Sequence, residues 1–204
     1  METLTKKKKT RSVSVRTRSV RKPKTLEAFL QWEQPEGPYK YEWVEGTLEK
    51  TEYMMKNTEL DIVRNLRQAF YATAFFREKG ELFAEALVQI SETRARIPDL
   101  AAYSDHQIKS ARKNEHPVPT FAVEIISPNE KGFRIEQKTL DYFAAGVQVL
   151  WQIYPNVRLV KVLTSPRDVQ MCFGADTCTA APALPDLQLT VDELLGGATE
   201  QGDQ

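Results

Sequence analysis

Arg96-Ile97-Pro98-Asp99, Phe121-Ala122-Val123-Glu124-Ile125-Ile126-Ser127-Pro128 and Ile135-Glu136-Gln137-Lys138 follow one another within a single stretch of the chain. The middle segment is apolar except for Glu124, and its Ile and Val content is typical of a buried strand. An ionised carboxylate buried in such a strand costs several kcal/mol unless it is paired or binds a metal ion. Glu124 is therefore the first candidate for a functional residue.

Asp99 is the second candidate carboxylate. Residues Arg94 to Tyr103 are predicted to form a strand in which Asp99 points to the same face as its odd-numbered neighbours. If this strand pairs with the one at 121–126, Asp99 and Glu124 meet at one rim of the sheet. Carboxylate oxygens are the ligands that Mg²⁺ and Mn²⁺ prefer. We expect the two carboxylates on one face of the sheet, within about 3 to 6 Å of each other.

A lysine follows on the next predicted element. Residues Phe133 to Ala145 have the pattern of a helix that ends at Gly146, and Lys138 lies on its apolar face. The side chain of such a lysine either extends along the apolar surface into solvent or points its ammonium at the carboxylates. An ordinary buried ion pair with Glu124 or Asp99 is an alternative explanation that involves no chemistry.

These residues resemble the Uma-two family of restriction endonucleases, a bacterial branch of the PD-(D/E)XK nuclease superfamily. The resemblance covers about residues 25 to 195. Any single landmark is weak, but the ordered set at these spacings is specific. The landmarks are Tyr41-Glu42-Trp43-Val44-Glu45-Gly46, Arg96-Ile97-Pro98-Asp99, Val123-Glu124-Ile125-Ile126-Ser127-Pro128, Lys138 with Tyr142 and Ala145-Gly146-Val147, Trp151 with Pro155, and Leu184-Pro185 with Leu194.

The resemblance implies a restriction-endonuclease-like α/β fold, with a mixed central sheet flanked by helices. It implies a metal-dependent endonuclease that hydrolyses DNA phosphodiester bonds, with Mg²⁺ or Mn²⁺ as cofactor and DNA as partner, acting as a cytoplasmic homodimer. Asp99 and Glu124 are expected to bind the metal, and Lys138 to orient or polarise the attacking water. Glu42 matches an additional acid near the metal in the superfamily; a half-buried strand acid is the alternative interpretation.

The sequence also departs from the superfamily pattern. Ile126 stands where the lysine of the usual E-X-K motif belongs, and Lys138 on the helix is the expected replacement. Two other lysines are less suited to this role than Lys138. Lys131 lies in an exposed-looking loop, and Lys161 lies on a predicted strand that follows a turn well past the site. Many relatives carry a histidine where this chain has Glu59. A catalytically inactive nuclease-fold protein that serves as a DNA-binding or regulatory module is therefore the second hypothesis.

The charge of the chain is balanced but unevenly distributed. The whole sequence has 28 Lys and Arg against 28 Asp and Glu, while residues 1–24 contain ten basic residues and one acid, Glu2. We predict a disordered basic arm at 1–24, a nuclease-like domain at 25–195 and a flexible tail at 196–204. The arm is expected to contact DNA phosphates. A solvated tail without a role, a transit peptide and a nuclear signal at Lys6 to Lys9 are alternatives.

The remaining pattern predicts the elements around the central stretch. Two histidines, His106 and His116, stand in one predicted loop, where a metal site is not favoured. Cys172 and Cys178 indicate reduced thiols, with a disulfide as the alternative. The predicted elements are a helix at Leu26 to Trp32 capped by Thr25, a strand or hairpin at Tyr41 to Glu52 with Gly46 at the turn, a helix from Asn57 or Thr58 to Lys79 ended by Gly80, a strand at Leu82 to Ile90, an irregular segment at Asp105 to Pro119, strands at Gln148 to Tyr154, Arg158 to Leu163 and Val169 to Phe173, a linker at Ala180 to Pro185 and a short helix from Asp192.

Overall fold

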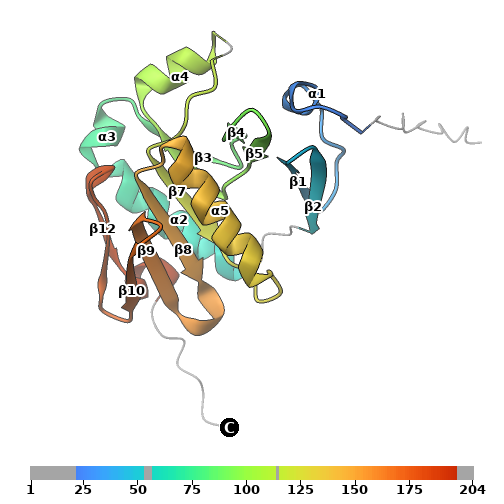
Figure 1. Cartoon of the computed structure of the whole chain (residues 1–204). Coiled ribbons are helices and arrows are strands. Elements are labelled where there is room, and N and C mark those ends of the chain that lie inside the picture. The colour runs from blue at the N-terminus through green and yellow to red at the C-terminus, as the bar shows by residue number, and fades with distance from the viewer. Residues whose placement is uncertain (1–21, 53–56, 114, 197–204) are drawn as a thin grey trace, which may run out of the picture.

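The computed structural model describes residues 22–52, 57–113 and 115–196, and in these ranges helices cover both faces of a mixed β-sheet (Figure 1). The expected α/β class is confirmed. The helices are α1 (Leu26–Leu30), α2 (Asn57–Tyr71), α3 (Ala74–Arg77), α4 (Asp105–Ala111), α5 (Gly132–Ala145) and α6 (Val191–Leu195), with a 3-10 turn at Pro155–Val157.

The central sheet of the described chain has six strands in the order β10-β9-β8-β7-β6-β3, and within it only β7 and β8 are parallel neighbours. A four-stranded sheet, β2-β1-β5-β4, and a hairpin, β11-β12, complete the structure. The strands are β1 (Tyr39–Val44), β2 (Thr47–Glu52), β3 (Glu81–Ala84), β4 (Val88–Gln89), β5 (Arg94–Arg96), β6 (Leu100–Tyr103), β7 (Phe121–Ile125), β8 (Val149–Tyr154), β9 (Leu159–Ser165), β10 (Asp168–Phe173), β11 (Thr177–Ala180) and β12 (Leu184–Thr190).

Strand β7 shows why Glu124 is buried. Successive side chains of a strand point to opposite faces. Phe121 and Val123 therefore pack into the main core with α2, α6 and the β11-β12 hairpin. Ala122 belongs to a second cluster with Tyr142 of α5, and Glu124 shares that face with it. Helix α5 crosses in front of this face in Figure 1, so the carboxylate lies between the sheet and the helix.

The small sheet has its own core, formed with α1. Phe29 of α1 stacks on Trp43 of β1, with ring centroids 5.9 Å apart, and Tyr41 and Ala95 complete the cluster. Thr25 caps α1, as predicted, because its hydroxyl accepts a hydrogen bond from the amide of Ala28. This packing joins α1 to the small sheet that contains β1.

The segment 94–103 was expected to be one strand, and this is wrong. It forms β5 in the small sheet and β6 in the central sheet, and the chain passes between the sheets at Ile97-Pro98-Asp99. Pro98 has no amide hydrogen and cannot continue a ladder. Asp99 therefore lies at the junction of two sheets. The expected strand at 82–90 divides in the same way into β3 and β4.

Three further expectations were wrong. The helix expected to reach Lys79 ends at Tyr71, and Thr73 begins α3 by accepting a hydrogen bond from the amide of Phe76 at 3.1 Å. The segment expected to be irregular contains α4, which opens with a capping box between Ser104 and Gln107. The expected linker at 180–185 is the turn of the β11-β12 hairpin.

Other expected elements are present. The first hairpin turns at Gly46, α5 ends at Gly146 with φ 110°, and β8, β9 and β10 lie where strands were predicted. In the described part of the chain no helix is long and apolar enough to cross a membrane. The predicted arm falls almost entirely, and the predicted tail largely, outside the described residues, so the domain boundaries stay predictions.

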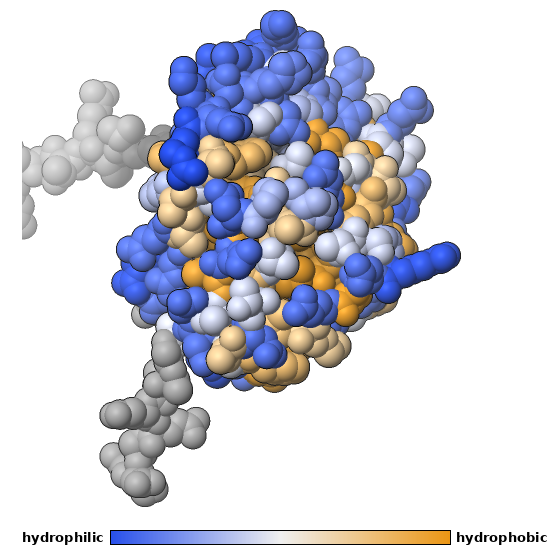
Figure 2. All heavy atoms as spheres, turned by 90° about the vertical axis from the view of Figure 1, so that its left-hand side faces the viewer, coloured by the Kyte–Doolittle hydropathy of each residue, from blue (hydrophilic) through white to orange (hydrophobic). Residues whose placement is uncertain are grey.

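The surface carries apolar side chains without a single continuous patch on the face shown in Figure 2, where hydrophobic areas alternate with hydrophilic ones. Isolated exposed apolar residues are normal on the surface of a folded domain. One regular set lies on the edge strand β10, where Val169, Met171 and Phe173 are 42%, 56% and 50% exposed. These three side chains alternate along the strand and share one face.

Gly80 offers a test of the packing between α3 and β3. A Cβ added there lies 2.3 Å from the ring of Phe75 and 2.8 Å from its carbonyl oxygen. We expect Gly80→Ala to lower the free energy of unfolding by about 1–3 kcal/mol, because the ring and the backbone must both shift. Urea denaturation measures this loss. Gly132→Ala is the matched control, since nothing lies within 4 Å of its added Cβ; equal losses in the two variants contradict the packing.

Candidate active site at the junction of two sheets

The register of the central sheet brings Asp99 and Glu124 together. Leu100 is the partner of Val123 in the antiparallel pair β6-β7. One step further along this pair, Asp99 lies opposite Glu124, with both side chains on the α5 face. Both are buried, with 6% and 3% of their surface exposed. The expected meeting of these carboxylates on one face follows from this register.

Asp99 is held by one charged and one backbone donor. The ammonium of Lys40, on β1, contacts Oδ1 of Asp99. The amide of Ile125 donates to Oδ2 at 2.6 Å. The carbonyl of Asp99 also accepts a hydrogen bond from the amide of Glu85 at 3.2 Å. The carboxylate is therefore oriented by β1 and β7 together.

Glu124 is held by helix α5. The ammonium of Lys138 lies 3.0 Å from Oε2 of Glu124, and the hydroxyl of Tyr142 donates to Oε1 at 2.5 Å. Lys138 also lies 3.6 Å from Oε1 of Glu130. Because Lys138 and Tyr142 are four residues apart, they project from one face of the helix. Lys138 thus points at the carboxylates and not into solvent, with only 12% of its side chain exposed.

Burial and charge act in opposite directions in this cluster. Burial raises the pKa of Glu124; the charge of Lys138 opposes the rise and the charge of Asp99 adds to it. Burial lowers the pKa of Lys138, but the charges of Glu124 and Glu42 outweigh it and leave the pKa above its usual value. The same balance, led by burial and reversed by Asp99, raises the pKa of Lys40. Both lysines are therefore cations at neutral pH.

Glu42 is buried, with 4% of its surface exposed, and its hydrogen-bond partners belong to the protein. The amide of Ile97 donates to its Oε1 at 2.9 Å, and Nη1 of Arg96 lies 3.1 Å from its Oε2. These bonds hold the first residue of the Ile97-Pro98-Asp99 junction. Glu42 is thus placed to position Asp99 through the backbone.

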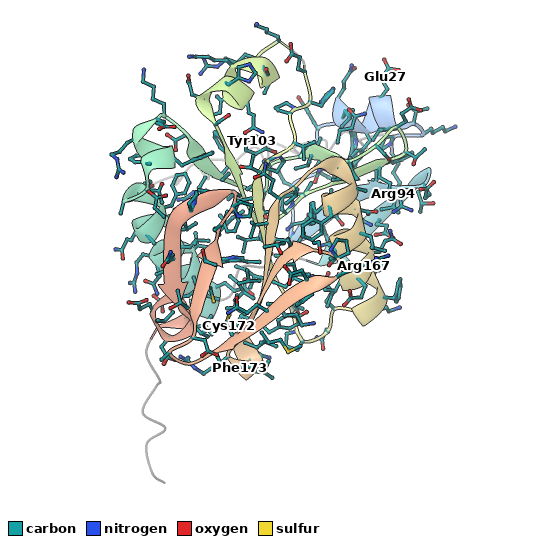
Figure 3. The ribbon with its side chains drawn as sticks, turned by 60° about the vertical axis from the view of Figure 1, so that its left-hand side comes forward. Glu27, Arg94, Tyr103, Arg167, Cys172 and Phe173 are labelled. Atoms are coloured by element: carbon teal, nitrogen blue, oxygen red, sulfur yellow. The ribbon has the colours of Figure 1, made fainter. Side chains whose placement is uncertain are left out.

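Arg96 joins the small sheet to α5. Its side chain is 3% exposed and lies 2.8 Å from Oδ2 of Asp141 on α5, in addition to its contact with Glu42. Arg94, whose place between the small sheet and the helix is visible in Figure 3, contacts Asp141 and Glu45. The arginines therefore connect the small sheet, which carries Lys40, to the helix that carries Lys138.

A polar row continues from Glu124 across the sheet. Gln152 is its neighbour on β8, and Lys161 is the neighbour of Gln152 on β9. Gln152 is fixed by a 2.7 Å hydrogen bond to Thr139 of α5. Lys161 thus lies two strands from Glu124, nearer than its sequence position suggested, with its ammonium 5.2 Å from the ring centre of Tyr154. Lys131, the other rival of Lys138, is exposed.

The chemistry of the acid pair fits Mg²⁺. The described residues contain no group of three or more His, Cys, Asp and Glu arranged to hold a metal ion. Mg²⁺ commonly uses only one or two protein carboxylates and takes its other ligands from water and substrate phosphates. Asp99 and Glu124 provide that number of carboxylates at the junction of the two sheets. Cys172, visible in Figure 3, and Cys178 are buried free thiols.

Two residues of the cluster were not predicted as site residues. Lys40 has the same strand parity as Glu42, so alternation along β1 was a signal that it points inward. Tyr142 was recognised only as a landmark, although its spacing from Lys138 places both on one helix face. Their contacts depend on how the small sheet and α5 meet the central sheet. The contacts themselves were therefore not readable from local patterns.

The sheet order, the acid pair and the helix lysine together define a restriction-endonuclease-like α/β protein. The Uma2 family model, described as "Putative restriction endonuclease", matches residues 26–192. The chain belongs to this family, and the expected resemblance is confirmed. No curated protein matches the chain.

A solved structure shares the fold. It carries the description "Crystal structure of a putative nuclease belonging to DUF820 from Anabaena variabilis ATCC 29413" and matches with a TM-score of 0.70 at 20% sequence identity. The match covers 85% of this chain and 98% of that chain. At this identity the likeness establishes the fold.

Arg96 allows the junction to be tested by stability. We expect Arg96→Met to lower the free energy of unfolding by about 3–5 kcal/mol, because it leaves Glu42 and Asp141 buried without their shared cation. The matched control is Arg158→Met, whose partner Asp192 is 47% exposed and whose loss should cost at most about 1 kcal/mol. Chemical denaturation compares the two variants. Similar losses would mean that the buried network does not hold the sheets together.

Proposed function

We propose that this protein is a metal-dependent endonuclease that hydrolyses DNA phosphodiester bonds. The observation that carries the proposal is the buried carboxylate of Glu124, opposite Asp99 and 3.0 Å from the ammonium of Lys138. Membership of the Uma2 family and the nuclease fold support a nuclease in general. Metal dependence and DNA as the substrate are the parts that the proposal adds.

Each residue of the cluster has a definite role in this proposal. Asp99 and Glu124 hold a Mg²⁺ or Mn²⁺ ion. When bound, the ion supplies Lewis acidity to water and to the phosphodiester. Lys138 orients the attacking water and places a positive charge where negative charge develops on the phosphate. Glu42 acts indirectly, by holding the junction that carries Asp99.

The carboxylates are oriented before any ligand arrives. Tyr142 fixes one oxygen of Glu124, and the amide of Ile125 fixes one oxygen of Asp99. A site on rigid elements whose side chains are held by neighbouring hydrogen bonds is the arrangement that catalysis requires. Both donors come from regular elements, α5 and β7.

A nuclease-fold protein without catalytic activity is the second candidate function. One observation favours it: each of the three acids already has protein donors, namely Lys40 and Ile125 on Asp99, Lys138 and Tyr142 on Glu124, and Arg96 and Ile97 on Glu42. Such a protein binds DNA or regulates a partner without turnover. It keeps the fold and the ion pairs but has no use for a metal ion.

Incubation of plasmid and linear duplex DNA with the purified protein decides between the two functions. We expect cleavage with Mg²⁺ or Mn²⁺ that EDTA abolishes. Lys138→Met should reduce the cleavage rate by about 10²-fold or more, because the charge beside Glu124 is lost, while Mn²⁺ binding and the fold persist. Lys161→Met is the matched control, since its ammonium lies against Tyr154, and it should cleave like the unmodified chain.

Two results contradict this assignment in different ways. Binding of DNA without cleavage under any divalent cation supports the inactive module. Cleavage by Lys138→Met at the normal rate transfers the role to another lysine, of which Lys131 is the nearest in sequence, or to no lysine at all. Circular dichroism of each variant verifies that the fold is retained.

The basic arm is proposed to add affinity for DNA without sequence preference. Its ten Lys and Arg residues neutralise phosphates and release counterions, so the logarithm of the binding constant falls with the logarithm of salt by about 0.9 per phosphate contact. Deletion of residues 1–24 should flatten this slope. Binding measured by fluorescence anisotropy at several salt concentrations gives the slopes. An unchanged slope assigns the arm no part in binding.

The homodimer and the cytoplasmic location are further parts of the proposal. Support for a dimer comes from β10, an edge strand of the central sheet that carries three exposed apolar side chains on one face. Unpaired edge strands offer backbone groups for pairing with another chain. A two-fold arrangement of two such edges gives a closed assembly.

A further inference from the structure

Lys40 is the charged residue of the cluster to which the proposed function assigns no role. It comes from β1, 59 residues before Asp99, and it is buried, with 9% of its surface exposed. Its ammonium contacts Oδ1 of Asp99, the carboxylate oxygen that is not bonded to the amide of Ile125. The charge of Glu124 raises the pKa of Lys40, and the charge of Lys138 lowers it. The positive charge of Lys40 therefore lies beside Oδ1 of Asp99, an oxygen that a metal ion would need as a ligand.

Two lysines face two carboxylates in this cluster. Lys40 contacts Asp99, and Lys138 contacts Glu124. This pairing reduces the cost of burying two neighbouring carboxylates, which in ionised form without cations is several kcal/mol for each ion. The folded chain thus has an internal substitute for a bound cation.

A bound divalent ion makes the net charge of the cluster positive, which suits a negatively charged substrate. With the ion bound to both carboxylates in their ionised form, the two lysines, the acid pair and the ion have a net charge of plus two. A phosphodiester and a hydroxide nucleophile together carry two negative charges. A single lysine with the acid pair and the ion would give only plus one. The second lysine therefore completes the match between the site and its reacting groups.

The structure also has space for the ammonium outside the acid pair. Lys40 lines a hollow of about 190 Å³ together with Gln34, Tyr39, Glu85, Leu87 and Ile97. Four methylene groups and free rotation let a lysine ammonium move several ångströms while its backbone stays in β1. The carboxylate of Glu85 and the amide of Gln34 belong to the residues around the hollow, so the displaced charge has polar neighbours.

We propose, resting on the function proposed above, that Lys40 is a second active-site lysine whose ammonium neutralises Asp99 until a divalent cation displaces it toward this hollow. Metal binding and movement of Lys40 are then linked. The ammonium lowers the affinity for the cation in the absence of substrate. It remains beside the site as a positive charge for the phosphate.

A purely structural role for Lys40 is the alternative, and it predicts the opposite change in metal affinity. If Lys40 serves only to orient Asp99, its removal disorders a ligand and weakens metal binding. If Lys40 competes with the cation, its removal strengthens metal binding, because a positive charge next to a divalent ion is lost. The sign of the change in affinity therefore separates the two roles.

The experiment is a calorimetric titration of Mn²⁺ into the full-length chain and its Lys40→Met variant. We expect Lys40→Met to bind Mn²⁺ at least about tenfold more tightly than the unmodified chain. Lys50→Met is the matched control. Lys50 belongs to the same hairpin, but its ammonium lies 3.3 Å from the ring centre of Tyr39, outside the acid pair, so its Mn²⁺ affinity should stay unchanged.

Two additional measurements assign the effect to Asp99. In an Asp99→Asn background, Lys40→Met should change the Mn²⁺ affinity much less, since the shared carboxylate has lost its charge. Without metal, Lys40→Met should melt at a lower temperature than the unmodified chain. Saturating Mn²⁺ should raise its melting temperature by more than it raises that of the unmodified chain.

Other outcomes overturn the proposal. If Lys40→Met binds Mn²⁺ as tightly as the unmodified chain or more weakly, Lys40 only orients Asp99 or has no part in metal binding. The proposed endonuclease function then still stands. If neither the unmodified chain nor Lys40→Met binds Mn²⁺, the metal-dependent function fails, and the inference about Lys40 fails with it. A tenfold gain that persists fully in the Asp99→Asn background places the effect of Lys40 elsewhere.

Discussion

Burial of the Glu124 carboxylate under α5 is the constraint on which the rest of the site depends. An acid in an apolar strand is tolerable only where cations and donors meet it. Here α5 supplies Lys138 and Tyr142, and β1 supplies Lys40 for the neighbouring acid. The helix, the central sheet and the small sheet must therefore meet at one point. Because the buried acids need these cations and donors, three segments far apart in the chain converge on this point.

The small sheet has a mechanical role in this arrangement. Its core of aromatic side chains with α1 holds β1 in place, and Arg96 links β1 and β5 to α5 through Glu42 and Asp141. The Ile97-Pro98-Asp99 junction then delivers Asp99 from one sheet to the other. Pro98 contributes to the site because it cannot continue the hydrogen-bond ladder of the small sheet. The next residue, Asp99, therefore lies beside β7.

Ile126 marks how this chain differs from the usual E-X-K pattern. In that pattern the lysine lies two residues after the acid, on the same face of the same strand. Here the position is a buried isoleucine, and the ammonium beside Glu124 comes from α5. A lysine on a helix approaches the carboxylate from above the sheet. The pair of a lysine and a glutamate is thus formed between two elements, α5 and β7. Its geometry therefore depends on how the helix packs on the sheet.

Local patterns in the sequence were sufficient for α5 and its end at Gly146, for β7 with its embedded acid, and for the place of Lys138 on the apolar face of its helix. These features depend on periodicities of 3.6 and 2 residues, which neighbouring side chains reveal. The division of 94–103 between two sheets, the contact of Lys40 with Asp99 and the approach of Lys161 were decided only by tertiary structure. They depend on which strands become neighbours, and that is set by packing between segments far apart in the chain.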